Sequence, residues 1–344
     1  MKDYQLVRLN ATLFPVGDFE RGLWQKHGLQ VTEVEANTPA DIIPHVRDCD
    51  AVFVISAALP TAVVESLERC RVISRLGTGT DKIDVETATR RGIVVSNVPF
   101  FCVEDQADHA IALLLGLARK LPQMSRLMAA GEFKAARQLS TQCVRLSTTT
   151  LGLVGFGRSA IETARRARGF GMRVTATRGR AGLPSPEAEA LGVTMTDLDT
   201  VLRESDYVSL HLPLTAATYH LLSDARLRMM KPGACLINTS RGALVDELAL
   251  VAALREGRLA GAGIDTFEGI NIFTEHEAPP DHPLLGLDNV ILTPHVAAGS
   301  VQSREDQMRG GVENAVAILQ GRWPPQAHIV NPTVIPRFAL QGLE

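Results

Sequence analysis

The chain has 344 residues, of which 45% are hydrophobic and 21% are charged, a composition typical of globular proteins with one large or two ordinary domains. Its formal net charge of -3 gives no sign of binding to nucleic acid or to anionic lipid. The longest apolar stretch, residues 110–118, is too short to cross a bilayer, and the five scattered cysteines show no pattern of a disulfide framework or a metal site. Since residues 1–10 lack the apolar core of a signal peptide, we expect a cytoplasmic protein without a membrane or nucleic-acid partner.

Short apolar runs alternate with helical patterns in the first hundred residues. The predicted strands are residues 51–55, 71–75 and 93–95, and the predicted helices between them are residues 62–70 and 85–92. This alternation is typical of a parallel sheet that is covered by helices on both faces.

A long helical pattern follows, and a second series of strands comes after it. Residues 104–126 have apolar positions at three- and four-residue spacing, whereas residues 128–150 are polar and irregular. The strands of the second series are predicted at residues 151–155, 172–176, 207–211, 234–238, 261–264 and 289–293. Six strands with helices between them indicate a doubly wound nucleotide-binding domain. We expect a final helix at about residues 302–320 and a Pro-rich end that packs against the first domain.

The turn after the first strand of this second series fits a dinucleotide-binding pattern. Gly155, Gly157 and Ala160 occupy the three small positions of G-x-G-x-x-G/A. Small residues there allow a tight turn, the approach of the backbone to a pyrophosphate, and close packing of helix on strand. A helix that begins at this turn would point its free N–H groups and positive dipole end at the phosphates. We therefore predict a dinucleotide site that includes Gly155, Phe156, Gly157, Arg158 and Ser159.

The residues after the next strand indicate which form of the cofactor is bound. Dinucleotide-binding units usually have an acid there, which accepts hydrogen bonds from the adenosine ribose and repels a 2′-phosphate. This chain has Arg178 and Arg180 instead, whose guanidinium groups suit bidentate binding of phosphate. We therefore expect NADP in preference to NAD, and the alternative is that both arginines are solvated and NAD is bound.

Three further segments resemble the D-isomer specific 2-hydroxyacid dehydrogenases, and the resemblance covers nearly the whole chain. The segments are SRLGTGTDKIDV at residues 74–85, INTSRGALVDE at residues 237–247 and NVILTPHVAAGS at residues 289–300. The resemblance implies an α/β protein with a Rossmann-type, doubly wound parallel sheet as cofactor domain, at residues 103–299. It also implies a smaller flavodoxin-like α/β substrate domain, at residues 1–102 and 300–344, and a cleft between the two domains.

Residues 105–120 also fit this family, with Asp108 and His109 where Glu-His is common. We expect the apolar face of this segment to belong to the core and to the interface of a homodimer, rather than to a site.

Carried over position by position, the resemblance implies roles for individual residues. Arg241 would bind the substrate carboxylate and polarise its carbonyl, which suits a guanidinium that stays charged. His295 would be the acid–base catalyst, exchanging a proton with the carbonyl oxygen as hydride is transferred. The loop around Thr78 and Gly79 would offer backbone N–H groups to the substrate carboxylate. The cofactor would be lined by His211, Leu212, Pro213, Thr239 and Ser240, with Asp265 at the nicotinamide carboxamide.

The third catalytic position departs from the family pattern. Family members usually carry F-E-x-E-P after the strand that ends in this aspartate, and the second Glu pairs with the histidine and raises its pKa. Residues 264–285 contain a few extra residues, and counting back from His295 leads to Glu275, with Glu277 close behind and Glu268 as a less favoured third candidate. The alternative for each of the three is a solvated loop acid.

The resemblance implies an oxidoreductase that transfers hydride between NAD(P)H and C2 of a small 2-keto acid, of the glyoxylate or hydroxypyruvate reductase kind. The candidates for contacts with the substrate side chain are Ala57, Ala58, Leu59, Phe100 and Phe101. One alternative is a dinucleotide-binding regulator of the co-repressor type, against which Arg241 and His295 count. Others are a formate, phosphite or alanine-type dehydrogenase and a phosphoglycerate dehydrogenase with a regulatory module, for which we expect no room in a chain that ends at Glu344.

Overall fold

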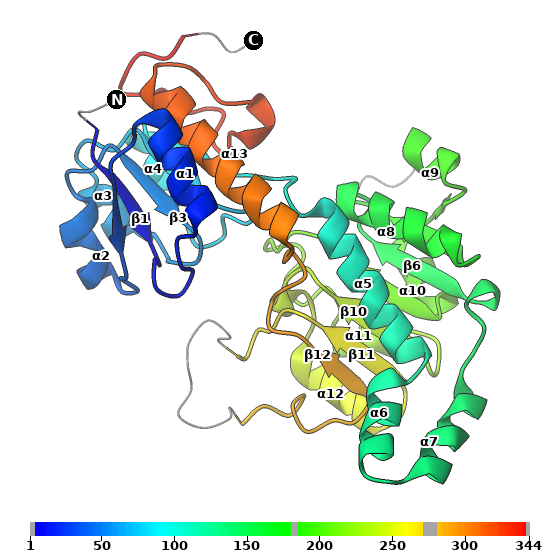
Figure 1. Ribbon diagram of the computed structural model, residues 1–344. Coiled ribbons are helices and arrows are strands. Elements are labelled where there is room, and N and C mark those ends of the chain that lie inside the picture. The colour runs from blue at the N-terminus through cyan, green and yellow to red at the C-terminus, as the bar shows by residue number, and fades with distance from the viewer. Residues whose placement is uncertain (1–3, 180–184, 271–280, 342–344) are drawn as a thin grey trace. The chain divides into compact units, whose positions relative to one another are not determined.

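The computed structural model describes residues 4–179, 185–270 and 281–341. The chain divides into two compact units, the first made of residues 1–102 and 300–344 and the second of residues 103–299. Each unit contains one parallel sheet with helices packed against it (Figure 1).

The sheet of the first unit has the spatial strand order β2-β1-β3-β4-β5, which is the flavodoxin-like order. Its strands are β1 (Leu6–Leu9), β2 (Val31–Val34), β3 (Ala51–Val54), β4 (Val72–Arg75) and β5 (Val94–Ser96). Its helices are α1 (Asp18–His27), α2 (Pro39–Val46), α3 (Thr61–Ser66), α4 (Val85–Arg90) and α13 (Val301–Leu319). Successive strand residues such as Leu6 and Val7 belong to two different core clusters, one packed with α1 and α13 and the other with α2, α3 and α4. Both faces of this sheet are therefore covered.

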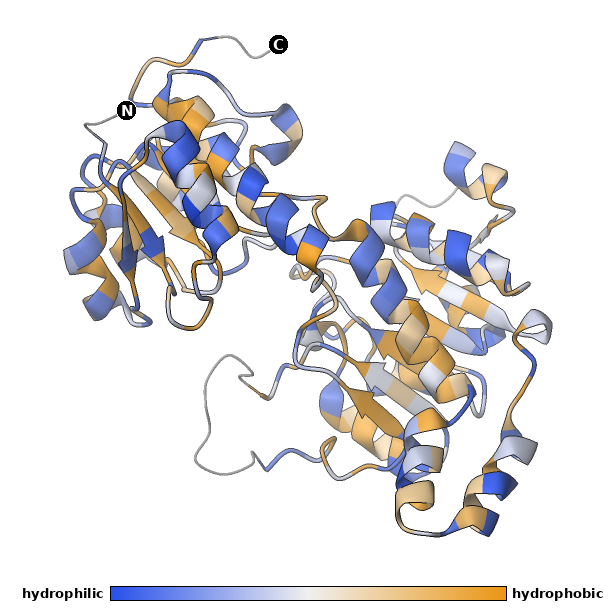
Figure 2. Cartoon of the chain, in the orientation of Figure 1, coloured by the Kyte–Doolittle hydropathy of each residue, from blue (hydrophilic) through white to orange (hydrophobic). Residues whose placement is uncertain are grey.

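The sheet of the second unit has the order β12-β11-β10-β9-β6-β7-β8, which extends the Rossmann order by one strand. Its strands are β6 (Thr150–Val154), β7 (Arg173–Thr177), β8 (Thr194–Met195), β9 (Tyr207–Leu210), β10 (Cys235–Asn238), β11 (Gly261–Ile264) and β12 (Val290–Leu292). Its helices are α5 (Val103–Ala118), α6 (Leu121–Ala129), α7 (Phe133–Leu139), α8 (Arg158–Gly169), α9 (Pro186–Ala190), α10 (Leu198–Glu204), α11 (Asp224–Leu227) and α12 (Glu247–Arg255). One core cluster joins the strands to α5 and α8, and the other joins them to α10, α11 and α12. Figure 2 shows the strands of both sheets as mostly hydrophobic and helices α1 and α8 as largely hydrophilic. The predicted fold class is confirmed.

Several predicted elements need correction. The predicted helix over 104–126 is two helices, because Lys120 adopts the left-handed conformation, with φ 51°, between α5 and α6. Residues 128–150 are not irregular, since they contain α7 and two short 3-10 helices. The structure also contains β1, β2 and the two-residue strand β8, none of which was predicted.

The C-terminal segment packs on the first unit, as expected. The backbone N–H of Val330 donates to the carbonyl of Val95 (2.9 Å), and the side chain of Asn331 accepts from the N–H of Val95 (2.8 Å). Residues after α13 therefore form hydrogen bonds with the edge strand β5.

Candidate functional site

The turn between β6 and α8 has a backbone that requires glycine at one position and is open at another. Gly155 has φ 98°, and a Cβ atom there would clash with the backbone carbonyl of His211. Gly157 is exposed, and a Cβ atom there would meet no described atom within 4 Å. The N-cap residue of α8 is Gly157, which has no side chain to cap the first turn. A helix N-terminus of this kind suits a dinucleotide pyrophosphate.

His211 is buried directly behind this turn. Its Nδ1 lies 3.1 Å from the hydroxyl of Ser159, and its Nε2 lies 3.0 Å from the hydroxyl of Ser209. Burial lowers the pKa of His211 to about 4, so the imidazole is neutral at physiological pH. The ring fixes the beginning of α8 against the end of β9, which is a positioning role.

The other predicted cofactor residues differ in what their side chains can reach. Phe156 lies in the core, so a contact to a cofactor would come from its backbone, whereas Arg158 and Pro213 are exposed. The hydroxyl of Ser240 donates to the carbonyl of Leu210 (2.7 Å). The hydroxyl of Thr239 is buried and has no partner within the part of the chain that the structure describes.

Arg178 follows β7 immediately and is half-buried. It therefore stands at the carboxyl end of the strand next to β6, where the adenosine ribose is bound in sheets of this order. Arg180 lies outside the described residues.

Arg241 follows β10 in a turn that is held rigidly. The amide of Asn238 accepts from the N–H of Ser240 (3.0 Å) and donates to the carbonyl of Arg241 (2.8 Å). A Cβ atom at Gly242 would clash with the backbone of Phe267 and Glu268, so the turn packs against the segment after β11. Arg241 is half-buried and its guanidinium donates to the carbonyl of Ser240 (2.8 Å).

His295 lies in a loop that Asp265 holds. The carboxylate of Asp265 is fully buried and accepts from the backbone N–H groups of Val296 and Ala297, both at 2.9 Å. It also accepts from the hydroxyl of Thr293 (2.5 Å), while the N–H of His295 donates to the carbonyl of Asp265 (2.8 Å). Both carboxylate oxygens are thus bonded to protein groups, which assigns Asp265 to holding this loop in the described structure.

Of the three candidate carboxylate partners of His295, the structure describes only Glu268. Glu275 and Glu277 lie outside the described residues. Glu268 accepts from the hydroxyl of Tyr219 (3.0 Å) and lies 2.7 Å from Nε2 of His220. Its carboxylate is thus engaged in the second unit by two neighbouring side chains, which disfavours it as the partner.

The carboxylate of Glu247, at the start of α12, holds both ends of the segment that contains these candidates. It accepts from the N–H groups of Glu268 (2.8 Å) and Gly269 (3.1 Å), and it lies 3.1 Å from Nε2 of His282. This role of Glu247 is not visible in the sequence, because an acid at a helix start is usually a cap.

In the first unit, the loop after β4 offers a row of backbone donors. The N–H groups of Gly77, Thr78 and Gly79 donate to no group in the described ranges, and Thr78 is exposed. Successive free N–H groups of this kind form an anion-binding nest. Carboxylate binding by this loop stays a prediction.

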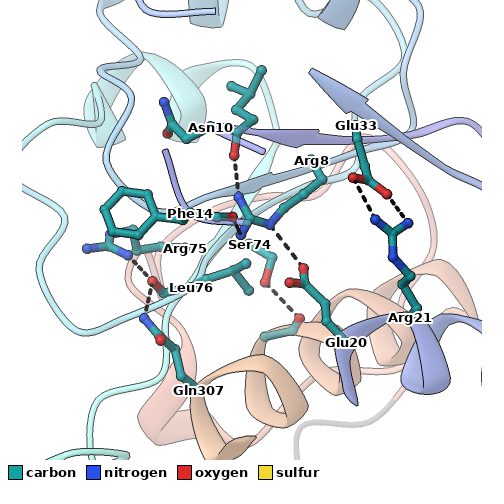
Figure 3. Close-up of polar contacts among 12 residues, drawn as sticks. Arg8, Asn10, Phe14, Glu20, Arg21, Glu33, Ser74, Arg75, Leu76 and Gln307 are labelled. Atoms are coloured by element: carbon teal, nitrogen blue, oxygen red, sulfur yellow. Dashed lines mark hydrogen bonds and ion pairs between the residues drawn. The ribbon is translucent and has the colours of Figure 1, made fainter. Parts of the chain in front are cut away.

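The guanidinium of Arg75 holds this loop through two backbone carbonyls, and Figure 3 shows its contact with Leu76. This guanidinium donates to the carbonyls of Gly79 (2.8 Å) and Leu76, and the amide of Gln307, on α13, also donates to the carbonyl of Leu76 (2.9 Å). A Cβ atom at Gly77, where φ is 133°, would clash with the Arg75 guanidinium. The glycine therefore permits the close approach of the arginine that shapes the loop.

The predicted contacts with the substrate side chain differ in their exposure. Ala57 and Leu59 are 6% and 1% exposed and belong to the core, which disfavours both as contacts with a substrate. Asn10 holds Ala57 in place, because its side-chain oxygen accepts from the N–H of Ala57 (2.7 Å). Ala58 is exposed and Phe100 is 40% exposed, so both stay candidates, as does half-buried Phe101.

Within the described ranges, no helix combines the length and the apolar character that crossing a membrane requires. In the same part of the chain, no group of three or more His, Cys, Asp or Glu side chains is arranged to hold a metal ion.

Comparison with known proteins gives consistent findings. The family model described as "D-isomer specific 2-hydroxyacid dehydrogenase, NAD binding domain" matches residues 111–297. A protein named glyoxylate reductase from Korarchaeum cryptofilum is 40% identical over 320 residues, which are 92% of this chain and 91% of that protein. The crystal structure of the TT0316 protein from Thermus thermophilus has a TM-score of 0.83 at 34% identity and covers 95% of this chain and 99% of its own. An acyclic imino acid reductase in complex with NADPH and D-Arg has a TM-score of 0.79 at 27% identity, over 96% of this chain and 99% of its own.

Proposed function

This chain belongs to the D-isomer specific 2-hydroxyacid dehydrogenase family, and we propose that it reduces small 2-keto acids of the glyoxylate and hydroxypyruvate kind with NADPH. One observation carries the proposal. The Gly155 turn, Arg241 and His295 follow β6, β10 and β12 of one parallel sheet, so all three stand at its carboxyl edge. Ligands of open α/β sheets bind at this edge.

We propose the second unit as the cofactor domain. The backbone from Gly155 to Ser159 and the start of α8 would hold the pyrophosphate, and Thr239, after β10, would lie beside the nicotinamide half. A bound nicotinamide dinucleotide supplies the hydride. Asp265 stands at the same edge, and its role would be to hold the loop that carries His295.

We propose the first unit as the substrate domain. The N–H groups of residues 77–79 suit a carboxylate. Arg75 and Gln307 keep these N–H groups in place, because they hydrogen-bond to backbone carbonyls of the loop. Arg241 would bind the carboxylate as well and polarise the carbonyl, because a guanidinium remains charged and offers several donors.

His295 would move the proton. In reduction, its imidazolium gives a proton to the carbonyl oxygen while C2 accepts a hydride, and in oxidation it takes the proton back. We propose Glu275 as the carboxylate that raises its pKa, with Glu277 as the alternative. The pH–rate profiles of Glu275→Gln and Glu277→Gln decide between them: the partner's variant shifts a limb of the profile and the other does not.

We propose NADP as the preferred cofactor. The support is the position of Arg178 at the end of β7, where the acid that would repel a 2′-phosphate is missing. The imino acid reductase with bound NADPH is a structural relative that accepts this form.

We further propose a homodimer that works in the cytoplasm. The arm formed by α6, α7 and the following turn exposes four large apolar side chains, Leu121, Met128, Phe133 and Val144, each more than half exposed. Such a group of apolar side chains is suited to burial against a second copy. All five cysteines are free, as in proteins of a reducing compartment, and cell fractionation tests the location.

A steady-state screen tests the proposed activity. The purified chain is given glyoxylate, hydroxypyruvate, pyruvate and phosphohydroxypyruvate, each with NADPH and with NADH, and formate or phosphite with the oxidised cofactors. We expect the highest kcat/KM for glyoxylate or hydroxypyruvate with NADPH. Binding of dinucleotide without turnover of any acid would instead support the co-repressor type of function.

A further inference from the structure

A partly buried series of hydrogen bonds connects helix α5 to the loop that carries His295. Nε2 of His109, on α5, lies 2.9 Å from the hydroxyl of Thr293, and that hydroxyl lies 2.5 Å from Oδ1 of Asp265. The same carboxylate accepts the N–H groups of Val296 and Ala297. His109 is 184 residues away from Thr293 in the sequence, so no local pattern reveals this contact.

The chemistry of the groups fixes the direction of each hydrogen bond. An ionised carboxylate accepts and does not donate, so the hydroxyl of Thr293 donates its proton to Asp265. The oxygen of Thr293 is then an acceptor toward His109, which must carry its proton on Nε2. Nε2 also lies 3.6 Å from Oδ1 of Asp265, so the ring and the carboxylate face each other directly.

The His295 loop is in a conformation that needs such support. His295 has φ 55°, in the left-handed region that residues other than glycine seldom adopt. Its own N–H donates to the carbonyls of both Asp265 (2.8 Å) and Thr293 (3.0 Å). The conformation therefore persists as long as Asp265 and Thr293 stay where they are.

We propose that His109 is a positioning residue for His295. His109 orients the Thr293 hydroxyl toward Asp265. Asp265 in turn accepts the N–H groups of the two residues that follow His295, Val296 and Ala297. This role deepens the proposed function, since it takes His295 to be the acid–base group. A displacement of a catalytic group by about 1 Å costs up to roughly 100-fold in rate, so a residue outside the reacting atoms has a measurable effect.

The test compares two substitutions at one position. His109→Leu removes the donor, whereas His109→Gln places an amide N–H close to the position of Nε2. The matched control is Asp108→Asn on the same helix, because Asp108 is 69% exposed and pairs with Arg166, outside the route to His295. Three quantities are measured: amide hydrogen exchange over residues 293–299, kcat and KM for the best keto acid, and Kd for NADPH.

We expect faster exchange of residues 293–299 in His109→Leu, and a kcat lower by roughly 10- to 100-fold with KM and Kd within about a factor of two. His109→Gln should restore most of the slow exchange and most of kcat. Asp108→Asn should resemble the unmodified chain in all three measurements. Unchanged exchange at 293–299 in His109→Leu would overturn the proposal, and so would faster exchange throughout the unit. The exchange arm needs no turnover, so it decides the positioning role even if the unmodified chain reduces no keto acid, a result that would refute the proposed function instead.

Discussion

The two glycines of the turn after β6 meet different constraints, although they belong to one motif. A side chain at Gly155 would clash with the backbone of His211 and would also require φ 98°. A side chain at Gly157 meets open space in the protein. The first glycine is thus needed by the fold, whereas no described group of the protein requires the second.

Alanine substitutions at these positions should therefore separate stability from binding. We expect Gly155→Ala to unfold at lower temperature, with a loss of more than about 1 kcal/mol in the free energy of unfolding. Gly157→Ala should unfold like the unmodified chain but bind NADPH and NADH more weakly, because its methyl group lies where the pyrophosphate approaches the backbone. Thermal unfolding and fluorescence titration measure the two effects. Normal binding by Gly157→Ala would rule out this turn as the pyrophosphate site.

The buried ring of His211 should make stability depend on pH. Its pKa is lowered by burial to about 4 in the folded chain, from an ordinary value near 6.5, so the unfolded chain binds the extra proton in this interval. Stability from this group is complete above pH 6.5 and falls as the pH drops toward 4, by up to about 3 kcal/mol.

Replacement by a group that does not titrate should flatten this dependence. Urea unfolding of His211→Gln between these pH values should show a smaller decrease than the unmodified chain. Burial also lowers the pKa of His328, in the first unit, so part of the decrease should remain. An identical decrease in the variant and the unmodified chain would show that His211 is not buried in its neutral form.

Arg178 should decide between the two forms of the cofactor. In the variant Arg178→Asp with Arg180→Ala, we expect NADPH to bind more weakly by roughly 10- to 100-fold per lost contact. NADH should bind as well as before or better, since the new acid can accept from the ribose hydroxyls. Titrations at low and high salt measure both, and salt should weaken NADPH more in the unmodified chain. Equal affinities with equal salt dependence in that chain would mean that the arginines are solvated.

Among the elements, the predicted strands were those in which apolar residues predominate. β3 and β9 are buried at every position, and such runs are visible in the sequence. β2 reads VTEV and is mostly uncovered at the edge of its sheet, so its pattern resembles a loop. β1 contains Arg8, which is 1% exposed because it pairs with Glu20 of α1 (3.0 Å; Figure 3). A buried charge of this kind depends on a partner that only the fold supplies.

The arm of α6 and α7 should be required for dimer formation. Phe133→Asp with Met128→Asp places two charges among its exposed apolar side chains, and we expect the variant to elute as a monomer with unchanged far-UV circular dichroism. Leu248→Asp is the matched control, because Leu248 is 73% exposed on α12, outside the arm. Light scattering after size exclusion gives the masses. A dimeric arm variant, or a monomeric unmodified chain, would refute the proposed assembly.

For the whole molecule, the parts of the candidate site that could be predicted are those with local motifs. Gly155, Arg241 and His295 each follow a strand, so the sequence alone places them at the carboxyl edge of one sheet. The groups that hold the surrounding loops are different. His109 contacts a residue 184 positions away, and Glu247 contacts residues 21 to 35 positions away, and such partners are chosen by packing rather than by spacing.

We propose above that His295 delivers the proton during hydride transfer to a 2-keto acid. A single-turnover experiment tests it most directly: enzyme saturated with NADPH is mixed rapidly with glyoxylate, and the loss of nicotinamide absorbance is followed for the unmodified chain and for His295→Ala. We predict rapid oxidation of one NADPH per site in the unmodified chain and a rate lower by roughly 10²- to 10⁴-fold in the variant, with unchanged NADPH affinity. Oxidation at similar rates in both chains would contradict the account.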